Sequence, residues 1–144
     1  MLLTHRQSAF LAFLLLAACA GTPGPTKRTD SESVQIANPA SQRCAAEGGT
    51  HVIERDGGGG QYGLCIFSDD RECEEWALFR GHCPIGGLKI AGYTKPAARY
   101  CAITGGFYTV VDQSGGGNEQ GICELPSGKT CDADAYYRGS CGRN

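Results

Sequence analysis

Residues 73–83 read Cys-Glu-Glu-Trp-Ala-Leu-Phe-Arg-Gly-His-Cys, and residues 131–141 read Cys-Asp-Ala-Asp-Ala-Tyr-Tyr-Arg-Gly-Ser-Cys. Both stretches begin and end with cysteine, and both place an Arg-Gly pair shortly before the final cysteine. Two more cysteines precede each stretch, at intervals of 21 and 8 residues in the first copy and 22 and 8 in the second. This repeated spacing indicates an internal duplication of a unit of under about fifty residues.

Eight of the nine cysteines in this 144-residue chain belong to the duplicated unit. The first copy holds Cys44, Cys65, Cys73 and Cys83, and the second holds Cys101, Cys123, Cys131 and Cys141. The copies also agree between their cysteines, since Pro39-Ala40 corresponds to Pro96-Ala97 and Gly48-Gly49 corresponds to Gly105-Gly106. We therefore expect two units with the same order of elements.

The ninth cysteine, Cys19, follows a stretch that is typical of a secretory signal. Residues 1–18 have a short polar start and an apolar run that is too short for a spanning helix of about 20 residues. Leu16-Ala17-Ala18-Cys19 resembles a bacterial lipobox, at which a lipid is attached to the cysteine before the signal is removed. The alternative is an ordinary cleaved signal with an incidental cysteine near the cut.

A lipid on Cys19 would determine where the protein works. Several acyl chains hold a protein stably on a membrane, so the lipobox implies a lipid-anchored protein of the bacterial cell envelope. Ala20 follows the cysteine where an Asp would favour the inner membrane, and we therefore expect the outer membrane, facing the periplasm. Disulfides form and persist outside the cytoplasm, and the eight remaining cysteines are enough to pair completely.

Composition divides the chain into five segments. They are a lipoprotein signal peptide (1–18), a flexible tether (19–36), a first Cys-rich unit (37–84), a linker (85–93) and a second, diverged Cys-rich unit (94–144). The tether is rich in Gly, Thr, Pro, Ser and Lys and has almost nothing to bury.

The first unit has the pattern of a helix, a β-hairpin and a short helix. Asn38 and Pro39 form a typical helix start, and Gly48-Gly49 ends the helix. The later elements are strands over Thr50–Glu54 and Tyr62–Phe67, a turn at Gly57–Gly60 and a helix over Glu72–Phe79. This order predicts an α+β fold.

The second unit repeats this order. Its elements are a helix over Pro96–Thr104, strands over Phe107–Val111 and Gly121–Leu125, a glycine turn at 115–117, and a turn or helix over Asp132–Tyr137. Lys95 replaces the capping Asn38, although Thr94 could cap one residue earlier. Asp134 stands in the place of Trp76, so the largest apolar side chain of the first unit has no counterpart.

Units of this size bury too little apolar surface to fold securely without covalent help. Each disulfide contributes about 3 kcal/mol for a loop of about 15 residues, so two per unit would supply the missing stability. Four cysteines allow three pairings, and the sequence does not choose among them. We favour a bond from the hairpin to the following helix, Cys65–Cys73, which leaves Cys44 to pair with Cys83. The second unit would repeat this pairing as Cys123–Cys131 and Cys101–Cys141.

The first unit resembles a family called domain of unknown function 333. The resemblance lies in Asn38-Pro39-Ala40-Ser41, in Gly63-Leu64-Cys65 and, most specifically, in Cys73-Glu74-Glu75-Trp76-Ala77. Members of that family are short exported bacterial proteins or lipoproteins that often carry a hemolysin label. The resemblance implies an exported location, and it brings no particular reaction with it.

Several motifs have an alternative interpretation as catalytic or nucleotide sites. Residues 127–130 resemble the end of a phosphate-binding loop, but Cys123 stands where that loop needs a glycine, so we expect a turn and no nucleotide. The glycine runs 57–60 and 115–117 could wrap an anion, but they suit hairpin loops better. Asp69-Asp70 suits a turn and Glu74-Glu75 a helix start, rather than two carboxylates facing each other across a sugar bond.

No metal, cofactor or catalytic residue is expected. Zinc-binding cysteines normally stand two to four residues apart, and no two of these cysteines are closer than eight. His51 and His82 have no counterpart in the second unit, and we interpret both as solvated or half-packed. Asp69 to Glu75 does not fit a calcium loop either.

Trp76 and Phe79 are the candidate binding surface. Aromatic side chains dominate the energetics of protein interfaces, so this pair could anchor a partner. The competing interpretation, which we favour for Trp76, is that it fills the small core of the first unit. Arg80 and Arg138 occur in both copies, and a structural role is expected for them.

The charge of the chain bears on its partners. The formal net charge is −2, and nothing in it would attract nucleic acid. The first unit is acidic, which favours a basic partner or simple solubility. Beyond the signal, no amphipathic helix, long apolar segment or set of alternating strands is present that could enter a bilayer.

These observations predict a lipid-anchored, non-catalytic binding or structural module of the envelope, with an envelope protein or the cell wall as partner. One alternative is a secreted inhibitor or hemolysin-like toxin that engages its target through a loop such as Gly57 to Gln61. Another is an envelope hydrolase, which has little support because no nucleophile, base and orienting group occur together.

Overall fold

The computed structural model describes residues 38–112 and 119–142. The signal peptide, Cys19, the tether and the glycine turn at 115–117 lie outside these residues.

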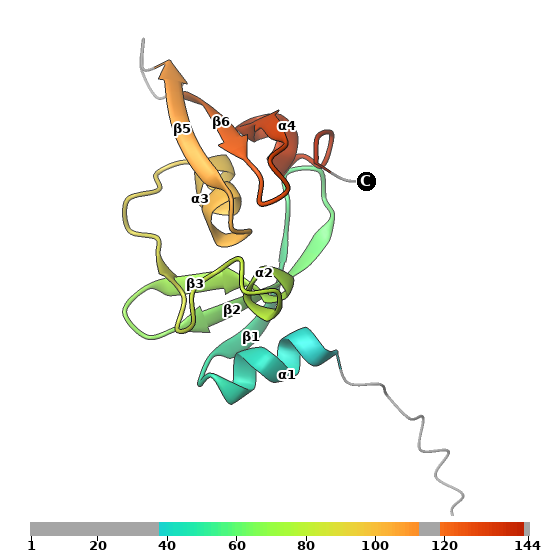
Figure 1. The fold of residues 1–144 in the computed structure, drawn as a ribbon, viewed down its shortest axis with the longest axis vertical. Helices are drawn as coiled ribbons and strands as arrows, with labels where there is room; N and C mark the ends of the chain where they lie inside the picture. Colours follow the sequence, from blue (N-terminus) through green and yellow to red (C-terminus); the bar gives the residue numbers. More distant parts are fainter. Residues whose placement is uncertain (1–37, 113–118, 143–144) are drawn as a thin grey trace, which may run out of the picture. The chain divides into compact units, whose positions relative to one another are not determined.

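The first repeat consists of two helices and a four-stranded antiparallel sheet. Its elements are α1 (Pro39–Ala46), β1 (Thr50–Arg55), β2 (Gln61–Phe67), β3 (Arg71–Glu74), α2 (Glu75–Phe79) and β4 (Leu88–Lys89). The strand order is β1-β2-β3-β4. In Figure 1, α1 is cyan and the strands it accompanies are green. Asn38 caps α1 as predicted, its side chain accepting a hydrogen bond from the Ala40 amide.

The second half of the first repeat differs from the prediction. The helix expected from Glu72 begins only at Glu75, because residues 71–74 pair with β2 as a third strand. Asp69 and Asp70 both have positive φ, 61° and 55°, and form the turn that brings this strand back. The carboxylate of Glu74 then caps α2, accepting from the amides of Trp76 and Ala77 at 3.0 and 2.7 Å.

The segment predicted as a linker also contributes to the sheet. Leu88 and Lys89 of β4 pair with Glu72 and Arg71 of β3. The short strand is held from the side as well, since the Arg71 guanidinium donates to the Gly87 carbonyl at 3.2 Å. Residues 85–93 therefore extend the first repeat before the chain enters the second.

The second repeat follows the same plan with fewer strands. Its elements are α3 (Pro96–Ile103), β5 (Phe107–Asp112), β6 (Gln120–Glu124), β7 (Thr130–Asp132) and α4 (Ala133–Tyr137), with strand order β5-β6-β7. Lys95 is the N-cap residue of α3, and its side chain makes no capping hydrogen bond. The α+β prediction is confirmed in both repeats.

The disulfides occupy the centre of each repeat, but their pairing differs from the one that we favoured. The bonds are Cys44–Cys65, Cys73–Cys83, Cys101–Cys123 and Cys131–Cys141. Cys65 and Cys73 are direct neighbours across β2 and β3 and point the same way. Each is bonded instead to the segment packed over it, Cys65 to α1 and Cys73 to the loop after α2. The error arose from placing Cys73 on a helix.

The shared Gly48-Gly49 and Gly105-Gly106 pairs have a clear structural reason. The first glycine of each pair follows the helix with a positive φ, +80° at Gly48 and +84° at Gly105. The second lies against the disulfide, and a Cβ on Gly49 would come within 2.3 Å of the Cys65 sulfur. The second glycine therefore lets the chain pass beside the sulfur atoms.

The two repeats contact each other within one unit, Gln35–Asn144. Arg99 of α3 donates to Glu72 at 2.7 Å and to Glu54 at 2.9 Å, both in the first repeat. The rings of Tyr62 and Tyr100 meet edge to face, with their centres 5.2 Å apart. Among the helices of the described residues, none has the length and apolar character needed to cross a membrane.

Candidate binding surface

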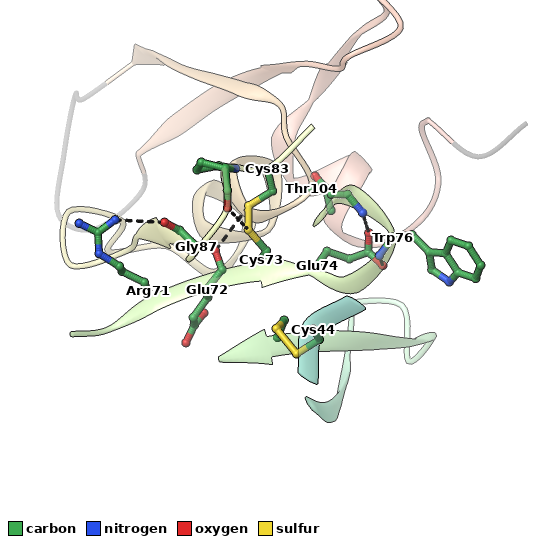
Figure 2. The surroundings of a disulfide bond; sticks show 12 residues. Cys44, Arg71, Glu72, Cys73, Glu74, Trp76, Cys83, Gly87 and Thr104 are labelled. Carbon is green, nitrogen blue, oxygen red and sulfur yellow. Dashed lines mark hydrogen bonds between the residues drawn. A yellow bond between two sulfur atoms is a disulfide. The ribbon is translucent and has the colours of Figure 1, made fainter. Parts of the chain in front are cut away.

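Trp76 and Phe79 lie on the surface, not in the core. Their exposed fractions are 36% and 47%, whereas Ala77 and Leu78 of the same helix are 2% and 3% exposed. Figure 2 shows the indole of Trp76 directed away from the Cys73–Cys83 disulfide. The prediction that Trp76 fills the core was therefore wrong. The two disulfides and small apolar side chains fill that space, and helix α2 turns its tryptophan outward.

Two contacts hold the Trp76 side chain in place. Its ring meets Phe79 nearly at right angles, with centres 5.6 Å apart and an interplanar angle of 79°. The Arg80 guanidinium carbon lies 5.6 Å from the indole centre, in a cation–π arrangement. The backbone beneath is fixed by the Glu74 cap. An exposed aromatic that is already ordered loses little side-chain entropy when a partner covers it.

A pocket of about 250 Å³ lies beside Trp76. Its lining includes Ile53, which is 57% exposed, together with Tyr62, Gly63, Glu74 and Glu75. The pocket combines an apolar rim with two acidic side chains. A partner that places an apolar group on the rim and a cation inside would match both features.

Glu75 lines this pocket, is buried, and is approached by three side chains. It is 5% exposed and accepts hydrogen bonds from Asn38 Nδ2 at 2.8 Å and Ser41 Oγ at 2.7 Å. His51 Nε2 lies 2.9 Å from its Oε2 atom. Ser41 and His51 therefore approach the same carboxylate oxygen, Oε2 of Glu75.

A second pocket, of about 290 Å³, lies between the repeats. It is lined by Tyr62, Glu74 and Arg80 of the first repeat and by Tyr100 and Tyr136 of the second. Burial raises the pKa of both Glu74 and Tyr136 above their ordinary values. Tyr62 and Glu74 line both pockets, so the two adjoin each other next to α2.

The described residues of the second repeat, 94–112 and 119–142, form no equivalent of this surface. Asp134, in the place of Trp76, pairs with Lys95 at 3.3 Å. Ala133 replaces Glu75, and the ring of Tyr108 takes the space above Gly121 that the Glu75 carboxylate takes above Gly63. Burial and a 2.7 Å hydrogen bond to Glu119 raise the pKa of Tyr108. The polar cluster and the exposed tryptophan thus occur together, in the first repeat.

The other sequence candidates lie apart from this surface. Gly57 donates to the Tyr137 carbonyl at 3.0 Å, so the tip of the first hairpin is seated on the second repeat. A Cβ on Gly57 would come within 2.7 Å of the Tyr137 ring, which explains the need for glycine there. Residues 127–129 form an exposed turn that leads into β7, and Asp69-Asp70 are exposed in their turn. In the described parts of the chain, no three His, Cys, Asp or Glu side chains are grouped to hold a metal ion.

Sequence reasoning missed the Glu75 cluster and the bridging role of Arg99. His51 was interpreted as solvated or half-packed, and Glu75 was considered only with Glu74 beside it. The available signal was a set of coordinated differences between the copies. Asn38, Ser41, His51 and Glu75 correspond to Lys95, Ala98, Tyr108 and Ala133. Residues that change together between two copies of one fold are expected to be neighbours.

The comparison with protein families agrees with the duplication. The family model described as Domain of unknown function (DUF333) matches residues 35–82 and, a second time, residues 92–140. The two matches together span more than half of the chain and coincide with the two repeats. Comparisons with curated proteins and with solved structures found no match.

Proposed function

Given that this chain belongs to the DUF333 family and carries two tandem copies of its domain, we propose that it is a non-catalytic binding module of the bacterial cell envelope. The observation that carries the proposal is the exposed, ordered Trp76 beside an acidic pocket. Exposed aromatics of this kind act as anchors in protein interfaces. In the described part of the second repeat, Asp134 stands in the place of Trp76.

The chemistry of the pocket favours a basic segment of an envelope protein as the partner. Glu74 and Glu75 line the pocket, and the indole of Trp76 adds a ring face that attracts cations. Ile53 supplies an apolar contact on the rim. A lysine or arginine flanked by an apolar residue would match the acidic side chains, the indole face and the apolar rim.

The envelope location rests on the sequence and on the disulfides. Four disulfide bonds are stable in an oxidising compartment. The lipobox-like residues before Cys19 would anchor the chain by a lipid at the outer membrane, facing the periplasm. We expect Cys19→Ser to move the protein from the membrane fraction to the soluble envelope fraction. Equal membrane association of the Cys19→Ser protein would contradict the lipid anchor.

Site-specific photocrosslinking in cells tests the binding role. A photoreactive amino acid at position 79 lies next to Trp76, and the same group at Ile85 serves as the matched control, since Ile85 is 75% exposed and outside the pocket. We expect one stoichiometric envelope protein to be captured at position 79 and not at position 85. Trp76→Ala should reduce this capture at least tenfold.

Three results would count against the proposal. Capture that is equal at both positions would show that the surface is not selective. Capture of cell-wall fragments without protein would assign the surface to a different partner class. Efficient lysis of red cells by the purified chain from Ala20 onward would favour a toxin.

A further inference from the structure

Helix α3 is covered on two sides. Ala97 and Cys101 belong to the core of the second repeat, which contains the disulfides. Ala98, Ala102 and Ile103 are 1%, 4% and 0% exposed, yet they lie outside that core cluster. The same helix sends Arg99 and Tyr100 to side chains of the first repeat. The outer side of α3 is therefore packed on the first repeat.

The surface that receives α3 is the outer face of the first sheet. Glu54 pairs with Tyr62 in the register of β1 and β2, and Glu72 lies on the same face of β3. All three contact Arg99 or Tyr100. Leu64, also on this face, is fully buried although it lies outside the core cluster of the first repeat. The internal interface thus joins the sheet of one repeat to the helix of the next.

The corresponding face of the second sheet is exposed. Phe107 and Val111 of β5 and Ile122 of β6 are 71%, 58% and 36% exposed. They alternate with the buried Gly121 and Cys123, as expected for a sheet covered on one side. In the matching strand registers Thr109 corresponds to Val52 and Ile122 to Leu64, so this face is the counterpart of the one that α3 covers.

Helix α1 has the complementary free surface. Gln42, Arg43, Ala45 and Ala46 correspond to Arg99, Tyr100, Ala102 and Ile103, and all four are exposed. One molecule therefore exposes both partners of this helix-on-sheet interface. The helix is α1 in the first repeat, and the sheet face belongs to the second repeat.

We propose that the chain self-associates head to tail, with α1 of one copy seated on the outer face of the second sheet of the next copy. The contact continues the interface between the repeats from one molecule to another. It is heterologous, so each added copy leaves one helix face and one sheet face free at the two ends, until a ring closes or a filament grows. It uses a surface separate from the Trp76 pocket and does not depend on the proposed function.

Paired differences between the copies support this occupant. The internal interface places Arg99 against Glu54 and Glu72. In the proposed contact Gln42 and Thr130 take the places of Arg99 and Glu72, so both sides of that ion pair have become neutral together. Asp112, which lies opposite Gln120, takes the place of Glu54. The Tyr62–Tyr100 contact becomes Gln120 with Arg43, which can form a hydrogen bond.

Sedimentation equilibrium of the oxidised chain from Ala20 onward, which contains the whole unit Gln35–Asn144, tests the proposal. We expect the average mass to rise with concentration beyond that of a dimer. Val111→Lys blocks the sheet face and Ala45→Glu blocks the helix face, so each variant alone should remain monomeric. A mixture of the two should form a dimer and nothing larger. The intact helix face of the Val111→Lys chain can bind the intact sheet face of the Ala45→Glu chain, and the two remaining faces are blocked. Ile85→Lys, at a more exposed position off both faces, should associate like the original chain.

Each contrary result is decisive. A monomeric chain at millimolar concentration would overturn the proposal. Association that survives Val111→Lys would place the contact elsewhere, and failure of the mixture to form a dimer would exclude the head-to-tail arrangement. Unfolding curves and disulfide maps of both blocked variants must match those of the original chain. If Val111→Lys does not fold, Ile122→Lys takes its place, since Ile122 lies on the same face.

Discussion

Arg99 Nη1 in the second repeat lies 2.9 Å from Glu54 Oε2 in the first, so an ion pair joins two copies of one ancestral unit. Arg99 also bonds Glu72, and Tyr62 donates a 2.6 Å hydrogen bond to the same Glu54 carboxylate. The corresponding position in the first repeat is Gln42, which makes no such bridge among the described residues. The bridging arginine therefore occurs in the helix of the second copy and not in that of the first, so the two copies are not interchangeable along the chain.

Replacing Arg99 should weaken the fold by uncoupling the repeats. Arg99→Met leaves Glu54 and Glu72 without their charged partner, and we expect a loss of about 1–3 kcal/mol in the free energy of unfolding. Arg55→Met is the matched control, because the Arg55 side chain is exposed and donates to the Gly59 carbonyl at 3.0 Å, and we expect a loss of at most about 0.5 kcal/mol. Urea unfolding measures both. Equal losses in the two variants would contradict a special role for Arg99.

The same ion pair should make stability depend on acid pH. The hydrogen bond from Arg99 lowers the pKa of Glu54 below its ordinary 4.5. A carboxyl whose pKa is lower in the folded state stabilises the fold above its unfolded pKa and loses that contribution as pH falls through the folded value. The stability difference between the original chain and Arg99→Met should therefore be full at pH 7 and shrink below about pH 4. A difference that stays constant down to pH 2 would contradict this.

Removing the Glu75 carboxylate should destabilise the first repeat. Glu75→Ala leaves the Asn38 amide and the Ser41 hydroxyl without their acceptor, and we expect a loss of about 2–3 kcal/mol. Asp134→Ala is the control in the second repeat, where a half-exposed pair should contribute under about 1 kcal/mol. Thermal unfolding monitored by circular dichroism compares the two. Similar melting temperatures for both variants would show that the buried cluster adds little.

Peptide mapping without reduction should recover four disulfide-linked pairs. We expect Cys44 with Cys65, Cys73 with Cys83, Cys101 with Cys123 and Cys131 with Cys141. Replacing both Cys73 and Cys83 by serine should lower the free energy of unfolding by about 3 kcal/mol. Recovery of a Cys65–Cys73 peptide as the main product would contradict the structure.

The elements with local signals were predictable. Asn38-Pro39 and Gly48-Gly49 enclose α1 because capping and helix termination depend on the few residues at each end. The alternation of β5 and β6 is visible in Phe107 to Val111 and Gly121 to Leu125. Strand β3 was missed because the helical composition of Glu72–Phe79 outweighs a strand of four residues. Pairing with β2 supplies hydrogen bonds that no local pattern reports.

The duplication, the helix starts, the hairpins and the need for disulfides follow from sequence alone, because they rest on spacing and on local backbone preferences. The partner of each cysteine, the outward direction of Trp76, the Glu75 cluster and the bridge made by Arg99 were decided by the tertiary structure. These depend on which residues far apart in the chain are brought within a few ångströms by the turn at Asp69-Asp70 and by the packing of one repeat on the other. Distance in space between such residues is a property of the whole fold, and no short stretch of the chain encodes it.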